Sequence, residues 1–256
     1  MSTEVYPEVP FLQQDLINYD GAYPSKGFDF VLGSNSSVNN VRVDLWEGPT
    51  GTYVFPPAGG IQMRVVSTSA NDTLAGTGAQ VVHIHYLDNT YAMQEVQINL
   101  NGTTPVNTIP TNILRINGFH VIQAGTGGTS AGNISLQNTA GTVTYGYIVA
   151  GFNSAQQAIY TIPAGKTGYV SHWQCSSGTS TGNHFTRFYL RTTSHLGSAW
   201  PVFLSADSYG TQNNGGVISF PIPFKIPATC DVKVSAISDA GGANAICQAV
   251  VMGWFE

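Results

Sequence analysis

The sequence predicts an all-β protein that consists of two related β-sandwich domains and an N-terminal extended arm. Residues that favour strands, namely Val, Ile, Thr, Tyr and Phe, are abundant, whereas Glu, Lys and Leu are few. Short runs of alternating apolar and polar residues are separated by Gly, Asn and Pro, which form turns. Several segments of the first half recur in the same order in the second half. Because the hydrophobic period is two throughout, we expect few helices.

The length and the low charge limit the classes of function. The 256 residues are enough for two domains of about 100 to 150 residues each. Charged residues make up 9% of the chain, against about 25% in an ordinary soluble domain. Nine basic and fourteen acidic residues give a net charge of −5, so the chain offers no basic surface for a phosphate backbone. We therefore expect no binding of DNA or RNA.

The sequence also lacks the signals of membrane proteins and disulfide-rich proteins. No run of apolar residues approaches the ~18 that span a bilayer, and the N-terminal MSTEVYPEVPFLQQDL has no basic start before an apolar run. We expect no Sec signal, no membrane insertion and synthesis in the cytoplasm. Cys175, Cys230 and Cys247 are odd in number and widely spaced, which predicts buried thiols and leaves their disulfide state open.

Residues 1–45 differ in composition from the rest and are predicted to form the N-terminal arm. They contain several prolines, a short amphipathic stretch from Phe11 to Ile17, and the turn-rich GSNSSVNN at 33–40. Such a segment cannot by itself bury enough apolar surface to offset its ordering entropy. We expect the arm to pack on its own domain or to lie across a neighbouring subunit.

Two series of strand-like runs follow the arm and define a first β-sandwich domain at 46–150 and a second at 151–256. The first series is GIQMRVVSTS, AQVVHIHYL, QEVQINL, ILRINGFHVIQA, NISLQ and TVTYGYIVAG. The second series is AIYTIPAG, TGYVSHWQCSS, NHFTRFYLRTT, VFLSAD, GVISFPIPFKI, CDVKVSAIS and ICQAVVMGWF. Turn clusters separate the runs, as is typical of sandwiches with many short strands.

The two series contain corresponding elements, which indicates a duplication. The turn VFPPAG at 54–59 corresponds to YTIPAG at 160–165, and each precedes a strand, a Ser/Thr/Gly loop and a second strand. Pro fixes φ at the strand end and Gly supplies a positive φ, so the chain can reverse there. Further along, Ile-Pro precedes a strand in both halves, and a Gly-rich loop follows that strand. We infer two homologous sandwiches.

The repeated segments also carry a resemblance to a known family. The sequence PAGGIQMRVVSTSANDTLAGTGAQVVHIHYLD, followed by EVQINLNGTTPVNT and RINGFHVIQAGTGGTSAGNISL, resembles virion structural proteins of tailed bacteriophages, particularly marine phages. YTIPAGKTGYV is similar to their downstream repeat. The resemblance covers about residues 55–175 and does not include the arm. It implies a particle component, such as a head decoration protein, a head spike or a tail-associated adhesin, and it names no catalytic residues.

Composition and resemblance together favour self-assembly. Sheet edges with few Lys residues pair readily with other edges, and a closed homo-oligomer would bury them. By analogy with virion spikes we expect a trimer that contacts other virion proteins and is located in the virion. The expected architecture is two tandem jelly-roll-like β-sandwich domains with a structural, non-enzymatic role in capsid decoration or a head spike. The alternatives are a receptor-binding adhesin that recognises host surface glycan, and a double-jelly-roll capsid protein.

No catalytic constellation is recognisable, and no cofactor is predicted. A Gly-x-Ser-x-Gly elbow between a strand and a helix is not found, and the Gly-rich loops are followed by strand-like sequence instead of a phosphate-binding helix. Sparse acids on a β-protein usually cap turns. The carboxylate pairs considered for glycoside hydrolysis are Asp44 with Glu47, Asp88 with Glu95, and Asp207 with Asp231.

His83 and His85 are the sharpest local candidates for a metal site. Residues i and i+2 of a strand project from one face, so two imidazoles there could share an ion. His120 or a symmetry copy could supply a third ligand, but the sequence alone does not assemble three. The default interpretation is a pair of solvent-facing polar positions, and no metal is assigned.

A glycan-binding site is a further hypothesis. Sugar-binding proteins stack rings on exposed aromatic residues that are flanked by Asn, Asp and Gln, and the segment SADSYGTQNN at 205–214 has this composition. The same residue types also form ordinary loops. The candidate residues are Asp207, Tyr209, Gln212, Asn213 and Asn214.

Overall fold

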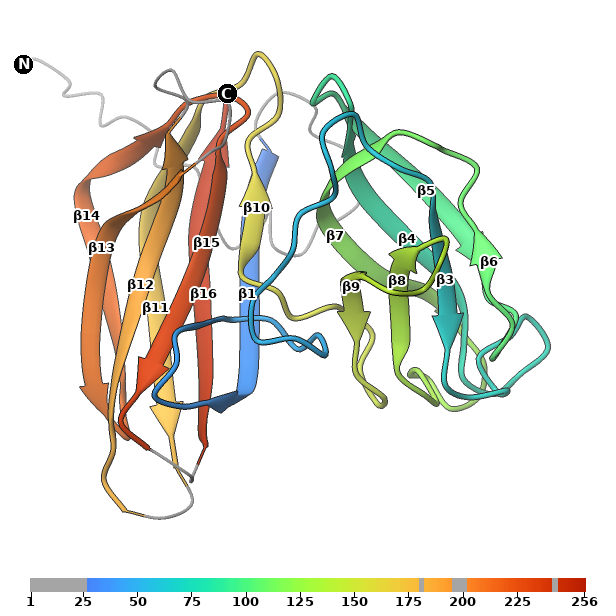
Figure 1. Cartoon of the computed structure of the whole chain (residues 1–256), viewed down its shortest axis with the longest axis horizontal. Coiled ribbons are helices and arrows are strands. Elements are labelled where there is room, and N and C mark those ends of the chain that lie inside the picture. Colours follow the sequence, from blue (N-terminus) through green and yellow to red (C-terminus); the bar gives the residue numbers. More distant parts are fainter. Residues whose placement is uncertain (1–26, 180–181, 195–201, 241–243) are drawn as a thin grey trace, which may run out of the picture.

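A computed structural model describes residues 27–179, 182–194, 202–240 and 244–256. In these residues all regular secondary structure is β-strand, with β1 to β16 in chain order and no helix. The expectation of an all-β protein is therefore confirmed. The strands form two sandwiches that lie side by side (Figure 1). The described part of the chain contains no helix long and apolar enough to cross a membrane.

The first sandwich is built from β3 to β9. Its two sheets have the strand orders β6-β3-β8-β9 and β5-β4-β7, and all pairs are antiparallel. Alternation in the sequence buries one face, as in β3, where every second side chain is buried. The strands are β3 (Met63–Ser67), β4 (Ala79–Asp88), β5 (Met93–Asn99), β6 (Val106–Asn107), β7 (Ile113–Ala124), β8 (Ile134–Asn138) and β9 (Thr144–Ile148).

The second sandwich combines both ends of the described chain. One sheet has the order β1-β16-β11-β14, and the other has the order β10-β15-β12-β13, with β2 also paired to β15. Its core includes Trp173, Phe188 and Leu190, all fully buried. The strands are β1 (Gly27–Val38), β2 (Val43–Asp44), β10 (Ile159–Thr161), β11 (Gly168–Gly178), β12 (Phe185–Ser194), β13 (Val202–Gln212), β14 (Gly215–Ile226), β15 (Asp231–Ser238) and β16 (Ala245–Phe255).

The structure corrects the assignment of residues 27–45 to the arm. β1 pairs antiparallel with β16 along most of its length, and β2 pairs with β15, so both belong to the second sandwich. The turn-rich composition was misleading because Asn35 is buried and its side-chain amide donates to the backbone carbonyl of Asp44 at 3.0 Å. Pairing with β16 overrides the local preference for turns. Residues 1–26 of the predicted arm lie outside the described residues.

The pairing of β1 and β2 with the C-terminal strands also means that the two sandwiches do not simply follow one another in the sequence, as the tandem arrangement predicted. The first sandwich is inserted between β2 and β10, so the second sandwich is closed by strands that are far apart in the sequence. Such an insertion destabilises the second sandwich only slightly, because the entropic cost of closing a loop grows slowly with the length of the loop.

The two sandwiches share one connectivity. β3 lies between β6 and β8, as β11 lies between β14 and β16. In the facing sheets β4 lies between β5 and β7, as β12 lies between β13 and β15. The paired turns identified in the sequence precede β3 and β11, so equivalent sequence segments occupy equivalent positions. β9 lies beside β8 as β1 lies beside β16, although β9 follows its partner in the chain and β1 precedes it.

Polar and aromatic contacts join the sandwiches. Arg115 of β7 forms an ion pair with Asp231 of β15, and the side-chain amide of Asn117 exchanges hydrogen bonds with the backbone of Thr161. In the segment between β2 and β3, Trp46 and Tyr53 meet edge to face, with ring centroids 5.1 Å apart, and the hydroxyl of Tyr53 donates to the backbone carbonyl of Tyr145 in the first sandwich at 2.9 Å. The junction is therefore packed and hydrogen-bonded.

Candidate functional site

The most concentrated set of metal-ligating side chains is a histidine cluster, which consists of His83, His85 and His120. Ile84 of β4 is buried in the core of the first sandwich, so the alternation of the strand places His83 and His85 on the opposite face. His120 lies directly across from His83 on β7. The third imidazole that the sequence left open is thus supplied by the neighbouring strand of the same chain.

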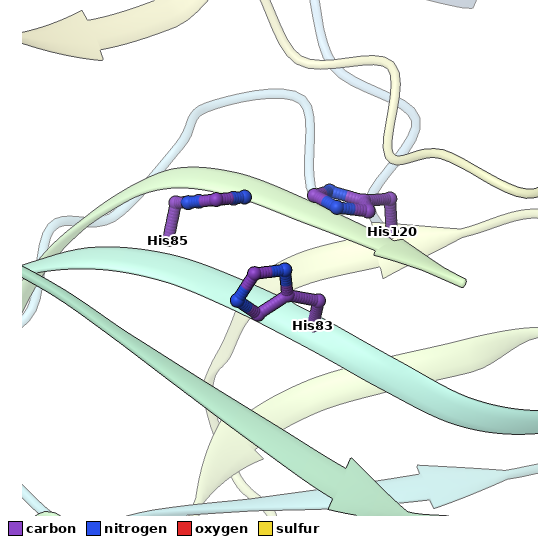
Figure 2. Close-up of side chains that lie close together, drawn as sticks. All are labelled: His83, His85 and His120. Carbon is purple, nitrogen blue, oxygen red and sulfur yellow. The ribbon is translucent and has the colours of Figure 1, made fainter. Parts of the chain in front are cut away.

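The rings of the histidine cluster converge. One ligand nitrogen from each side chain can be chosen so that all three lie within 4.8 Å of one another. The ring centroids of His83 and His85 are 4.2 Å apart, and that of His120 lies 5.3 Å from the first and 5.0 Å from the second. Figure 2 shows the three rings facing a common space above the sheet. All three residues are half-buried.

Gly118 makes room for this arrangement. It is the β7 residue opposite His85. A Cβ atom at this position would lie 3.2 Å from Cδ2 and 3.4 Å from Cβ of His85, tighter than ordinary van der Waals contact for the first atom. The absence of a side chain leaves the imidazole free to lean toward His120. Nothing in the sequence marks Gly118, because its role depends on which strand lies opposite.

Glu95 brings a carboxylate to the edge of the histidine cluster. It lies opposite His85 on β5, and its Oε2 is 3.3 Å from Nε2 of His83. The side chain of His83 is 13% exposed and that of Glu95 is 68% exposed. Within the described residues the buried Nε2 of His83 makes no hydrogen bond, because the contact with Glu95 has ion-pair distance without hydrogen-bond geometry.

The environment favours neutral imidazoles. Burial, together with the neighbouring His85 and His83, lowers the pKa of His120 to about 4. Burial and the proximity of His83 also lower the pKa of His85, while Glu95 opposes this shift. Both shifts favour the uncharged imidazole, and neutral imidazole is the form that binds metals.

The residues proposed for glycan binding are separated into two groups. Asp207 and Tyr209 lie on β13 itself, not in a loop. Asp207 accepts a hydrogen bond from the indole nitrogen of Trp173 at 3.0 Å, and Tyr209 packs half-buried against the core of the second sandwich. Both side chains thus take part in the internal packing.

Gln212, Asn213 and Asn214 come together at the turn between β13 and β14. The side chain of Asn213 donates to the carbonyl of Gly182 at 2.8 Å, and that of Gln212 donates to the carbonyl of Asn183 at 3.3 Å. Asn214 accepts from the backbone of Gly215. These contacts fix the turn to the 182–183 segment, and glycan binding here stays a prediction.

The four candidate aspartates take structural roles, whereas Glu95 lies at the histidine cluster and Glu47 has a buried carboxylate oxygen without a hydrogen bond among the described residues. Asp44 and Asp231 are buried and form ion pairs with Lys233 and Arg115, at 2.9 Å in each case. Asp88 accepts hydrogen bonds from the backbone of a turn. The Asp207 and Asp231 side chains are bound to different partners, Trp173 and Arg115.

One serine also has the sequence context of a nucleophile. Ser130 is central in GTSAG at 128–132, but a strand follows it and not a helix. Its hydroxyl donates to the backbone carbonyls of Val149 and Phe152. It therefore lacks the strand-to-helix elbow of a hydrolase.

The second sandwich has two open edges on one side. Among the described residues β13 pairs only with β12 and β14 only with β11, so each ends its sheet in that part of the chain. The two strands follow one another in the chain and lie on the side facing away from the first sandwich (Figure 1). We call them the open edge pair. Its exposed large apolar side chains are Val202, Leu204, Val217 and Ile222.

No protein-family model matches the chain, and no curated protein matches its sequence. Three virus structures are weakly similar to it. The top component of cowpea mosaic virus, a naturally occurring empty particle, is 15% identical, with 81% of this chain and 85% of that chain covered and a TM-score of 0.23. The infectious bursal disease virus Gt strain is 12% identical, with 96% and 77% covered and a TM-score of 0.21. The subviral particle of infectious bursal disease virus VP2 is 9% identical, with 90% and 71% covered and a TM-score of 0.18.

Proposed function

We propose that the chain is a non-enzymatic structural component of a bacteriophage virion that assembles with copies of itself and decorates or projects from the particle. The observation that carries this proposal is the open edge pair. Both strands end their sheets on the same side of the molecule, and both carry exposed apolar residues. Exposed edges of this kind favour association with another copy.

The charges on the open edge pair support the same proposal. Asp207 and Lys225 are the only Asp, Glu, Lys or Arg residues on β13 and β14. Asp207 is already bound to Trp173. The edges therefore carry too little charge to oppose pairing with another copy. Natural monomeric sheets, in contrast, usually protect their edges with Lys and other charged residues.

The connectivity supports a jelly-roll assignment of the second sandwich. Eight of its nine strands form two rows of four, with orders β1-β16-β11-β14 and β10-β15-β12-β13, and the two-residue strand β2 is added to the second sheet by pairing with β15. Two antiparallel sheets of eight strands with interlaced connections are the architecture of jelly rolls, which occur in viral capsids and in lectins. Since one fold serves many functions, the assignment to a virion rests also on the sequence resemblance to phage structural proteins, which favours a trimer.

A second candidate is a double-jelly-roll capsid protein. It is favoured by the connectivity that the first sandwich shares with the second. The two candidates differ in the number of copies per particle, because a capsid protein forms the shell and a decoration or spike protein is added to it. Quantitative mass spectrometry of purified virions would distinguish them.

The self-assembly part can be tested by changing the open edge pair. We expect the full-length chain to form a discrete oligomer in size exclusion coupled to light scattering. Ile222 is 84% exposed and Ile109 of the first sandwich is 88% exposed, so Ile109→Lys is a matched control for Ile222→Lys. The double variant Leu204→Lys with Ile222→Lys should lower the solution mass to that of a monomer, and Ile109→Lys should not.

A monomeric parent protein would contradict self-assembly through these edges. Binding to a glycan array by that monomer would instead support the adhesin alternative. Truncation of residues 1–45 is unsuitable for this test because it removes β1 and β2 from the second sandwich.

A further inference from the structure

We propose that His83, His85 and His120 bind one divalent transition-metal ion, with Zn²⁺ as the preferred ion, on the outer face of the β5-β4-β7 sheet. The proposal assigns to the first sandwich a metal site that is independent of the virion role. It rests on the convergence of three imidazoles from two adjacent strands.

The geometry is close to that of a zinc site. With Zn–N bonds of about 2.0–2.1 Å, two nitrogens of a tetrahedral site are about 3.4 Å apart. The three ligand atoms already lie within 4.8 Å of one another. Small rotations about the side-chain bonds are enough to close this difference, because the side chains project from neighbouring positions on the same face.

Glu95 is placed to complete the coordination. Its carboxylate lies 3.3 Å from Nε2 of His83 and is otherwise largely exposed. Carboxylate oxygens bind Zn²⁺ at about 2.0–2.2 Å. The Glu95 carboxylate can therefore act as a fourth ligand when an ion lies between it and His83. The Nε2 atom of His83 is buried and, although Glu95 lies at ion-pair distance, it makes no hydrogen bond among the described residues, which is unusual for a buried polar atom and is explained by an ion at this place.

The ligand types select the class of metal. Imidazole nitrogen suits Zn²⁺, Cu²⁺, Ni²⁺ and Co²⁺, whereas Mg²⁺ and Ca²⁺ prefer oxygen ligands. The chain has six histidines, and half of them are gathered here. In the rest of the described residues no other group of three His, Cys, Asp or Glu side chains has this arrangement.

The experiment is a titration of the metal-free full-length protein with Zn²⁺ by calorimetry and with Co²⁺ by absorption spectroscopy, with Mg²⁺ as the negative probe. We expect one Zn²⁺ per chain, Co²⁺ bands typical of imidazole coordination, no heat with Mg²⁺, and a higher melting temperature with Zn²⁺. His120→Gln and His85→Gln should each weaken Zn²⁺ binding by more than about 100-fold, since loss of even an outer partner costs about 10- to 100-fold.

The matched control is His184→Gln. His184 is a partly exposed histidine of the second sandwich whose Nδ1 lies 3.2 Å from Asp239, so its loss should leave Zn²⁺ affinity unchanged. Absence of Zn²⁺ and Co²⁺ binding by the parent protein would overturn the proposal, whether or not the variants fold. Equal affinity in the folded His120→Gln and His85→Gln variants would also overturn it. Neither result affects the test of self-assembly, which uses solution mass and different residues.

Discussion

Arg115 and Asp231 form a buried, two-point ion pair between the two sandwiches. Nε of Arg115 lies 2.9 Å from Oδ1 of Asp231 and Nη2 lies 3.3 Å from Oδ2, and the two side chains are only 9% and 2% exposed. Thr161 also donates to Asp231 at 2.6 Å, and the guanidinium lies over the ring of Phe55 at 4.7 Å. The pair therefore depends on residues from both sandwiches and from the segment that connects them.

Removal of one partner of this pair should be strongly destabilising. Arg115→Met leaves the Asp231 carboxylate buried without its counter-charge, and such changes cost about 3–5 kcal/mol. We expect a lower urea midpoint and separate unfolding transitions for the two sandwiches, measured by circular dichroism. The double variant Arg115→Met with Asp231→Leu should lose less than the sum of the two single variants.

Arg64→Met is a suitable control for this prediction. Arg64 is half-buried in the first sandwich, and its guanidinium binds Gln137 and the carbonyl of Thr139 and forms no ion pair with any described acidic residue. A loss of stability in Arg64→Met equal to that in Arg115→Met would contradict a special role of the ion pair.

Gly33 should be essential for docking of β1 in the second sandwich. A Cβ atom there would lie 2.3 Å from the backbone nitrogen of Ala158 and from the backbone oxygen of Leu45. Gly33→Val should therefore destabilise the protein by about 1–3 kcal/mol or more, as measured by thermal and urea unfolding. Gly178→Val is the control, because nothing lies within 4 Å of an added Cβ there, and its effect should be within about 0.5 kcal/mol. Equal stability of both variants would argue against the close approach of β1.

Gly118 should control the zinc affinity of the histidine cluster without being a ligand. Gly118→Val adds a branched side chain against the ring of His85, whose Cδ2 would be 3.2 Å from the new Cβ. We expect at least a tenfold loss of Zn²⁺ affinity by calorimetry. The circular dichroism spectrum of the metal-free protein should be retained. Unchanged affinity would show that His85 does not need this space.

The three cysteines should be unreactive in the folded protein. All three are buried thiols that form no disulfide with one another, and burial raises the pKa of Cys175 and of Cys247 to about 12. At neutral pH the thiolate fraction is then about a thousandfold below that of an exposed thiol. Ellman's reagent should detect no thiol in the native state and all three in guanidinium chloride. Ser205→Cys, at an exposed position, should add one rapidly reacting thiol, and fast reaction of the parent protein would contradict the buried placement.

The sequence predicted which segments form strands better than it predicted which strands pair with one another. Alternation of apolar and polar residues marked β3, β4, β7, β11 and β12, since a half-buried strand imposes a period of two, and it also marked β15, whose polar residues are buried as well. The corresponding turns before β3 and β11 also indicated a repeat, and these strands occupy equivalent places. β1 was missed because Ser34 and Asn35 read as turn residues, although they are buried beside β16 and β2.

The candidate metal site was predictable only in part. The spacing of His83 and His85 places both on one face of a strand, which follows from the geometry of any β-strand. His120 was named only as one of two sources of a third ligand. Its position opposite His83, and that of Gly118 opposite His85, follow from the register of β7 on β4. Register depends on hydrogen bonds between segments that are distant in the sequence.

The sequence by itself determined the all-β class, the low charge and the alternation that divides each strand into a buried and an outer face. Those properties follow from residue types and from a spacing of two, which are local. Only the tertiary structure decided that β1 closes the second sandwich, that Arg115 meets Asp231, and that three histidines converge. These relationships arise from pairing between distant segments, and many pairings are compatible with the same local pattern until side-chain packing and buried hydrogen bonds select one.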